Sequence, residues 1–146
     1  MRLLLCQRKN WQHGKASNLR LLLDTSTFLW ANMQSSSLSS AAKSAISDPS
    51  AKLLVSVASV WEMQIKHALG KLPLPRNAEQ VARKYASALD AELISITLDD
   101  IGSLYALPSH HRDPFDRILA AQAKSQSLTL VSPDEIFAHY PVDLIW

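Results

Sequence analysis

The sequence predicts an α/β fold in which helices cover both faces of a mainly parallel β-sheet of four to five strands. Short apolar runs alternate along the chain with segments of helical periodicity, the pattern of β-α-β units. Runs such as 21–23 and 128–131 lack the alternation of a half-exposed strand, so both faces of these strands should be buried. The 146 residues, of which 47% are hydrophobic, are enough for one domain with its own core.

Five apolar stretches are predicted to be strands. Each is short, rich in Leu, Ile or Val, and bounded by turn or helix-starting residues, such as the turn at 48–50 before the second strand. In chain order they are 19–23, 52–57, 93–96, 128–131 and a terminal edge strand at 142–145.

Helices are predicted between these strands from their capping residues and apolar faces. Ser59 and Glu62 have the spacing of a capping box, and Gly70 closes the helix that they open. Asp113 followed by Pro114 is typical of a helix start. The predicted helices are 27–33, 38–46, 59–69, 77–89, 97–107 and 113–123, with a last short helix opening at 132–135.

Charge is distributed unevenly along the chain. Residues 1–20 contain five basic residues and no acid, which leaves ten basic against thirteen acidic residues in the rest. We expect 1–18 to be a basic leader that is disordered or outside the domain, and 19–146 to be the domain; contact of the leader with nucleic acid is the alternative. The apolar part of the leader is shorter than the roughly 7 to 15 residues of a signal sequence.

The remaining composition favours a cytoplasmic protein without membrane association. The single cysteine, Cys6, cannot form an internal disulfide, and the five histidines lack the spacing of a zinc site. No stretch approaches the about 18 apolar residues of a membrane span. With three glycines the chain has no glycine-rich phosphate loop, and it has no Gly-x-Ser-x-Gly motif.

Four acidic residues are predicted to meet at the carboxyl edge of the sheet, where α/β proteins bind ligands. Two of them follow apolar strands and two lie in helices that adjoin strands. Carboxylates brought together repel one another unless a cation neutralises them. Oxygen ligands without imidazole or thiolate favour Mg²⁺, with Mn²⁺ as its substitute. The four acids are Asp24, Glu62, Asp116 and Asp134.

Each acid also has a structural role that the sequence leaves open. Asp24 and Asp134 could cap or stabilise helix starts. Glu62 could complete the capping box with Ser59, and Asp116 could pair with Asp113 across a helix start. The coincidence of all four positions favours a cation site, and a carboxylate-held Mg²⁺ that activates water predicts phosphodiester hydrolysis.

Polar residues beside the acids have two open interpretations each. The hydroxyls of Thr25, Ser26 and Ser132 either hold a carboxylate or a water in place, or cap helices. Lys66 lies four residues after Glu62 on the same helical face, and it either contacts a substrate phosphate or pairs with the acid.

A basic cluster surrounds the start of the helix at 113–123. It forms either a phosphate-contacting rim or a solvated surface. Trp30 and Trp61 are expected to be core or interface residues rather than base-stacking residues. The cluster consists of His110, His111, Arg112 and Arg117.

Four strings of the sequence stand out together: 21–25, 56–66 with 69–72, 111–123 and 130–134. They resemble the PIN-domain family, and more narrowly the VapC-type toxins of bacterial type II toxin–antitoxin modules. The second and third strings are long enough to be specific. The resemblance covers 19–146 in the right order and leaves the leader outside.

This resemblance implies a three-layer α/β/α fold and a Mg²⁺-dependent ribonuclease. It also implies an RNA substrate, a homodimer and a cognate antitoxin that blocks the site. Asp113 is an additional acid, and family members often have histidine where Ser26 stands and threonine where Ser132 stands. The four acidic positions of the family match Asp24, Glu62, Asp116 and Asp134.

The sequence therefore predicts a metal-dependent endoribonuclease. Asp24 and Asp116 are the expected principal metal ligands, while Glu62 and Asp134 complete the pocket and orient the attacking water. An aspartyl-phosphate phosphatase is an alternative, although such enzymes need an acid where Ser26 stands. The non-catalytic alternative is a PIN-like module that only binds RNA or protein, which would have little reason to keep a costly carboxylate cluster.

Overall fold

The computed structural model describes residues 18–109 and 112–146 and contains a five-stranded sheet with the order β3-β2-β1-β4-β5. Every neighbouring pair of strands is parallel, so the predicted parallel sheet and its terminal edge strand are confirmed. The leader before residue 18 and both His110 and His111 lie outside the described residues. The strands are β1 (Arg20–Leu23), β2 (Lys52–Ser56), β3 (Ala91–Ile94), β4 (Thr129–Val131) and β5 (Asp143–Ile145).

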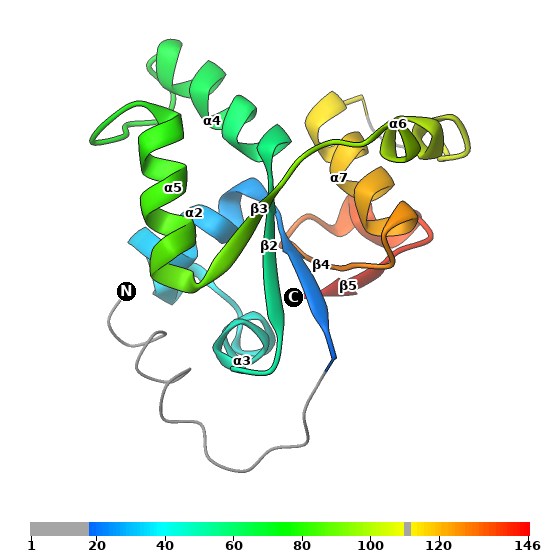
Figure 1. Cartoon of the computed structure of the whole chain (residues 1–146), viewed down its shortest axis with the longest axis horizontal. Coiled ribbons are helices and arrows are strands. Elements are labelled where there is room, and N and C mark those ends of the chain that lie inside the picture. Colours follow the sequence, from blue (N-terminus) through cyan, green and yellow to red (C-terminus); the bar gives the residue numbers. More distant parts are fainter. Residues whose placement is uncertain (1–17, 110–111) are drawn as a thin grey trace.

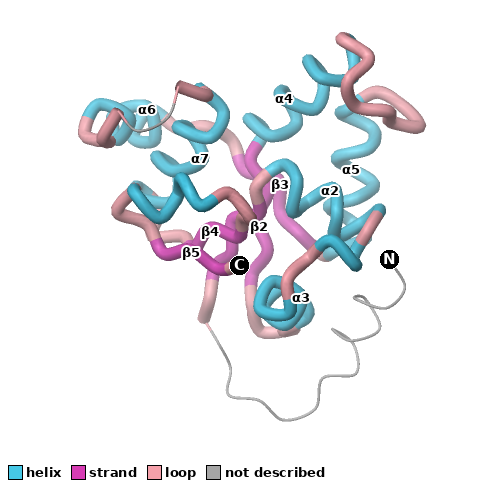
Figure 2. Tube along the Cα trace, turned by 180° about the vertical axis from the view of Figure 1, so that it is seen from behind, coloured by secondary structure: helices cyan, strands magenta, loops and turns pink. Residues whose placement is uncertain are grey.

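Six α-helices and two short 3-10 helices accompany the sheet in the described part of the chain. Figure 1 shows α2, α3 and α5 on one side of the strands and α6 and α7 on the other, while α4 extends from the carboxyl end of β2. The same two layers flank the strands from behind in Figure 2, so the three-layer α/β/α fold is confirmed. The helices are α2 (Thr25–Met33), η1 (Ser35–Ser37), α3 (Ser40–Ser47), α4 (Val57–Ala68), α5 (Ala78–Leu89), α6 (Leu98–Tyr105), α7 (Pro114–Ser125) and η2 (Glu135–His139).

Within residues 18–109 and 112–146, none of these helices combines the length and the apolar character that crossing a bilayer requires.

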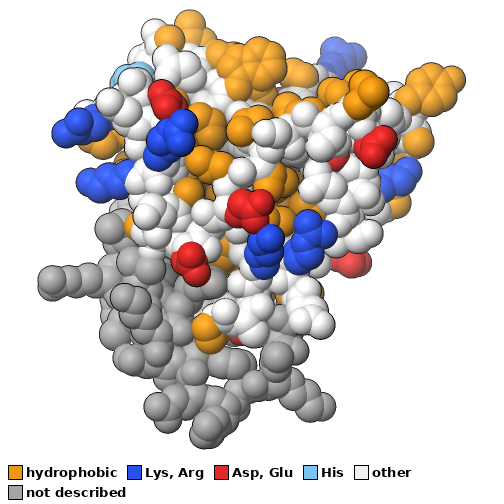
Figure 3. All heavy atoms as spheres, viewed as in Figure 1, with side chains coloured by type: hydrophobic (Ala, Val, Ile, Leu, Met, Phe, Trp, Pro, Cys, Tyr) orange, Lys and Arg blue, Asp and Glu red, His pale blue; other side chains and the backbone are white. Residues whose placement is uncertain are grey.

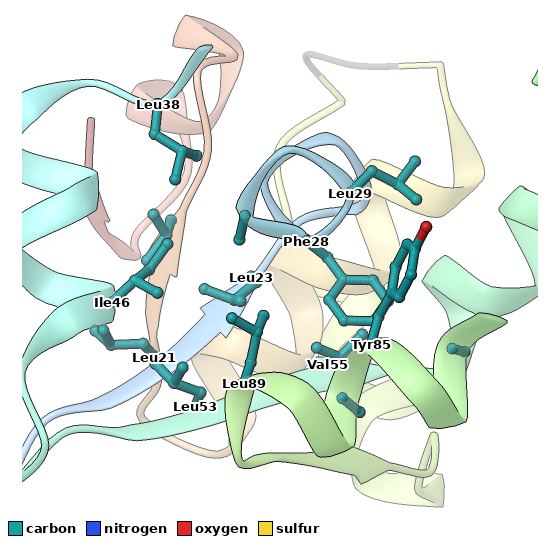
Figure 4. Packing of buried hydrophobic residues seen from close by; sticks show 14 of the residues in the cluster. Leu21, Leu23, Phe28, Leu29, Leu38, Ile46, Leu53, Val55, Tyr85 and Leu89 are labelled. Carbon is teal, nitrogen blue, oxygen red and sulfur yellow. The ribbon is translucent and has the colours of Figure 1, made fainter. Parts of the chain in front are cut away.

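The central strand β1 sends successive side chains into two separate cores. Leu21 and Leu23 pack with residues of α2, α3 and α5, whereas Leu22 packs with residues of α7 and β4 on the other face. Phe28 of α2 meets Tyr85 of α5 edge to face, with ring centroids 6.2 Å apart, beside Leu23 in Figure 4. Because both faces of β1 are buried, its sequence is continuously apolar.

The start of α4 differs from the prediction. Ser56, not Ser59, caps the helix: its hydroxyl accepts a hydrogen bond of 3.1 Å from the backbone amide of Ala58. Ser59 is buried inside the helix, so the predicted capping box between Ser59 and Glu62 is wrong. Glu62 lies in the second turn instead, with no capping role to satisfy its carboxylate.

Two further boundaries move by two residues. The helix predicted from residue 27 begins at Thr25, because Asp24 caps it by accepting a hydrogen bond from the amide of Thr27. The strand predicted at 93–96 lies at 91–94, because α5 ends at Leu89 and Asp90, with φ of 54°, turns the chain directly into the sheet.

A buried carboxylate, Asp100, joins α6 to α7. It completes a capping box with Thr97, whose amide donates to it over 2.8 Å, and it also accepts hydrogen bonds from Ser125 and Gln126. Burial alone would raise the pKa of Asp100, but the hydrogen bonds from Ser125, the Thr97 amide and Gln126 outweigh it, and the pKa lies below its ordinary value.

Substitution Asp100→Asn should lower the free energy of unfolding near neutral pH by about 2 kcal/mol, because hydrogen bonds to a charged group are lost. Since the folded pKa is below the unfolded value of about 3.9, the ionised carboxylate stabilises the fold above that value and loses this effect as the pH falls through the folded pKa. Urea unfolding measures the difference between variant and parent, which should shrink as the pH falls below the unfolded pKa of about 3.9. A difference that stays constant with pH would contradict this account.

Candidate active site

A pocket of about 500 Å³ lies at the carboxyl edge of the sheet. The chain moves from β1 to β2 and β3 in one direction and to β4 and β5 in the other, which makes a switch point beside β1 where α/β proteins form clefts. The polar lining includes all four predicted acids, together with Asp113, Thr25, Ser26 and Lys66. The fold therefore brings together side chains from the ends of β1 and β4 and from α4 and α7.

Asp24 is one of the two buried acids that line the pocket, with 6% of its surface exposed. Its Oδ1 accepts a hydrogen bond of 2.8 Å from the amide of Thr27, and its Oδ2 accepts one of 2.5 Å from the hydroxyl of Ser132. Ser26 lies farther away, 3.4 Å from both oxygens. Burial raises the pKa of Asp24, and the hydrogen bonds from Ser132, Thr27 and Ser26 offset only part of this effect. Ionisation of this carboxylate is thus favoured by a nearby cation.

The hydroxyl of Ser132 links the first acid to the fourth. It donates to Asp24 and accepts a hydrogen bond of 3.1 Å from the amide of Asp134. Asp134 is exposed and its Oδ1 accepts from the amide of Ile136 over 3.0 Å, so it caps η2. Both interpretations of Ser132, support of a carboxylate and capping of a turn, therefore describe contacts that the structure contains.

Glu62 is equally buried, and each of its oxygens has a partner. Oε1 accepts a hydrogen bond of 2.7 Å from the hydroxyl of Thr25, and Oε2 lies 2.7 Å from the Nζ atom of Lys66. The hydrogen bond with Glu62 raises the pKa of Lys66, and attraction to Asp113 and Asp116 adds to it. Of the two interpretations of Lys66, pairing with the acid is thus the contact observed.

The start of α7 contributes two acids but not the predicted basic rim. Asp113 caps the helix by accepting a hydrogen bond of 2.9 Å from the amide of Phe115, and Asp116 lies in the first turn. Arg117 instead donates to the carbonyl oxygen of Pro108 over 3.0 Å. Neither Arg112 nor Arg117 lines the pocket, so the structure does not place the described part of the rim there.

A lysine that the sequence analysis did not select, Lys71, also lines the pocket. Gly70, with φ of 69°, ends α4, and the amides of Lys71 and Leu72 both donate to the carbonyl oxygen of Lys66. His67 fixes the same turn through a contact of 3.0 Å between its Nδ1 and the oxygen of Leu72. A glycine placed directly after the last helical turn was the signal that could have located this segment.

The carboxylates share the pocket without forming a compact coordination cage. Among the residues described, no three Asp, Glu, His or Cys side chains stand close enough to hold one ion. Several of their oxygens accept hydrogen bonds or pair with Lys66. The donor set nevertheless fits Mg²⁺ or Mn²⁺, because such ions are usually held by one or two carboxylates together with waters and substrate phosphates.

Comparison with known proteins identifies the family of the chain. Residues 21–143 match the family model of the PIN domain. The chain belongs to the PIN-domain family. This match confirms the family to which the sequence strings pointed, although no curated protein matches the chain.

Several solved structures share the fold. One is VapBC2 from Rickettsia felis bound to a DNA fragment from its promoter, with 14% identity, coverage of 86% of this chain and 97% of that chain, and a TM-score of 0.64. FitAcB from Neisseria gonorrhoeae has 17% identity, coverage of 85% and 95%, and a TM-score of 0.56. A toxin–antitoxin complex from Klebsiella pneumoniae has 21% identity, coverage of 79% and 87%, and a TM-score of 0.50. These likenesses establish the PIN fold of the chain.

The turn at Gly70 allows a controlled test of how the pocket wall is built. Gly70→Ala should lower the free energy of unfolding by about 1 to 2 kcal/mol, because alanine is strained at positive φ. Gly102→Ala is the matched control: an added Cβ meets no atom within 4 Å at either position, and Gly102 lies inside α6. The control should raise stability by up to about 1 kcal/mol. Urea unfolding of both variants checks this, and changes of the same sign would contradict it.

Proposed function

We propose that this PIN domain is a divalent-cation-dependent endoribonuclease of the VapC toxin type. The observation that carries the proposal is the convergence of four acids from four separate segments on one pocket. Two of them, Asp24 and Glu62, are buried carboxylates held by short hydrogen bonds. Membership of the PIN family and the fold shared with VapBC2 support the same activity.

Asp24 and Asp116 would be the principal ligands of Mg²⁺, or of Mn²⁺ in its place. Glu62 and Asp134 would complete the acidic site that holds the ion and would help to orient the attacking water. A divalent ion bound there supplies a water of lowered pKa and a positive charge for the leaving oxygen. Thr25 and Ser132 keep the carboxylates of Glu62 and Asp24 in fixed positions. The reaction is hydrolysis of an RNA phosphodiester bond, and it needs no covalent nucleophile.

A cognate antitoxin is the proposed inhibitor. VapBC2 and the complex from Klebsiella pneumoniae are toxin–antitoxin assemblies, which supports a partner of the same kind here. The pocket also has an apolar wall that includes Leu29, Trp30 and Leu72. An inhibitor segment that joins apolar side chains to a basic one would complement this wall and the acids together.

The proposed homodimer is supported by an exposed apolar stripe on α4. Val57, Trp61, Ile65 and Leu69 recur every four residues and are 39%, 62%, 37% and 63% exposed. The ring of Trp61 rests edge to face on Phe115 of α7, with centroids 5.1 Å apart, but because it is 62% exposed it is not a core residue. Figure 3 shows apolar side chains gathered along the upper edge of the molecule, over α4 and α6. An exposed stripe centred on tryptophan is suited to an isologous interface.

Purified protein should cut total bacterial RNA into discrete products with Mg²⁺ or Mn²⁺, and chelator should stop the reaction. Asp24→Asn and Asp116→Asn should each abolish cleavage, because each removes a proposed ligand. Gel electrophoresis of the RNA measures this, with circular dichroism to verify the fold of each variant.

The matched control is Asp99→Asn, which removes one carboxylate from the exposed start of α6 and should leave cleavage unchanged. Full activity in a folded Asp24→Asn or Asp116→Asn protein would disprove the assigned site. Intact RNA with folded protein that binds Mn²⁺ would instead favour the binding-only module.

The dimer makes a separate prediction. Trp61→Glu should convert a dimer into a monomer, because a charge would be buried at the centre of the stripe. Met33→Glu, at an exposed apolar residue of α2 rather than of α4 or α6, is the control and should leave the dimer intact. Light scattering after size-exclusion chromatography measures the mass. A monomeric parent protein, or a dimeric Trp61→Glu variant, would contradict the proposed interface.

A further inference from the structure

Lys66 places a positive charge among the acids of the pocket. Its Nζ atom lies 2.7 Å from Oε2 of Glu62, one helical turn earlier on α4. Asp113 and Asp116, at the start of α7, also attract this ammonium group. A cation built into the chain therefore neutralises part of the acidic pocket.

The contacts of Glu62 make its pairing with Lys66 compete with its binding of a divalent ion. Oε1 is already engaged by the hydroxyl of Thr25, at 2.7 Å, and Oε2 by Lys66. A second cation that approached Oε2 would stand within a few ångströms of the ammonium and be repelled by it. Glu62 therefore binds a divalent ion through Oε2 more tightly once Lys66 has moved away.

Lys66 is able to make this movement. Half of its side chain is exposed, whereas the side chain of Glu62 is only 8% exposed. A lysine is a flexible four-carbon stem with a compact charge at its tip. Rotation about the stem would carry the ammonium to the mouth of the pocket, where an RNA phosphate would enter.

Building on the proposed nuclease function, we propose that Lys66 is an internal counter-ion with two alternative partners. It pairs with the carboxylate of Glu62 in the free protein and with an RNA phosphate when the substrate is bound. It neutralises Glu62 until a divalent cation takes over this carboxylate, and it then contacts the phosphate backbone of the substrate. Lys66 is a positioning residue, because it acts on how the ion and the RNA bind. Its removal should have opposite effects on the two ligands: tighter binding of the metal ion and weaker binding of the RNA.

Lys71 provides a matched control inside the same pocket. Lys71 lines the same pocket as Lys66, but it forms no ion pair with the acids that the structure describes. Neutralisation of Lys71 changes the net charge of the pocket by the same amount. If neutralising Lys66 changes ligand binding more than neutralising Lys71 does, the difference therefore reports the direct exchange at Glu62.

The first measurement is the affinity of Mn²⁺ for protein from which divalent cations have been removed. Electron paramagnetic resonance of the free ion monitors the binding. Lys66→Gln keeps a hydrogen-bond donor for Glu62 but removes the charge, and it should bind Mn²⁺ at least about tenfold more tightly than the parent. Lys71→Gln should gain less than about threefold, because Glu62 pairs with Lys66 and not with Lys71. Equal affinities in the parent and Lys66→Gln proteins, or equal gains in both variants, would overturn the proposal.

Thermal unfolding supplies a second readout that does not depend on catalysis. Without divalent ions, Lys66→Met should melt below the parent, since it leaves the buried carboxylate of Glu62 without its cation. Saturating Mn²⁺ should raise the melting temperature of Lys66→Met more than that of the parent. If Lys66→Met does not fold, the same comparison is made with Lys66→Gln. An equal rise in variant and parent would count against the exchange.

Cleavage of total RNA completes the test at saturating Mn²⁺. Lys66→Gln should raise KM by about tenfold while Lys66→Arg, which keeps the charge, stays near the parent. An unchanged KM in Lys66→Gln would refute the phosphate contact. If the parent cuts no RNA, the nuclease function fails, and the Mn²⁺ and melting experiments still decide whether Lys66 competes for Glu62.

Discussion

Parallel pairing of β1 with β2 on one side and with β4 on the other is the constraint on which the site depends. It brings the carboxyl ends of three strands to one edge of the sheet. Each end leads into the pocket: Asp24 follows β1, α4 with Glu62 follows β2, and the turn that contains Asp134 follows β4. Because β1 is buried on both faces, these positions are anchored by the two cores rather than by long loops.

The second requirement is a set of partners for carboxylates that have lost much of their water. Removing a charge from solvent is costly unless hydrogen bonds or counter-charges replace the solvent. The hydroxyl of Ser132 and the start of α2 donate hydrogen bonds to Asp24. Glu62 accepts a hydrogen bond from Thr25 and pairs with Lys66. The pocket is consequently built in advance of any ligand. To bind a cation and a phosphate, the carboxylate oxygens of the pocket need only replace their present partners with these ligands.

Most of the fold follows from local signals in the sequence, and the failures have physical causes. Leu21 to Leu23 predict a buried strand because every side chain there is apolar. The capping box was misplaced because both Ser56 and Ser59 precede Glu62, and the choice between them depends on where β2 leaves the sheet. Arg117 follows Asp116 in sequence but lies about 100° around the helix from it, towards Pro108. The meeting of the acids was predictable; the catalytic roles assigned to them remain proposals.

The charge of the chain indicates how metal ion and RNA would cooperate. Beyond residue 20, thirteen acids face ten basic residues, so general attraction for a polyanion is weak. A phosphate that approaches Asp24 and Glu62 is repelled until cations neutralise them. The ion and the RNA would therefore bind with positive coupling, and by linkage each would raise the affinity of the other to the same degree. The proposed exchange at Lys66 would strengthen this coupling. When the ion binds Oε2 of Glu62, Lys66 loses its contact with that oxygen and becomes available to the phosphate.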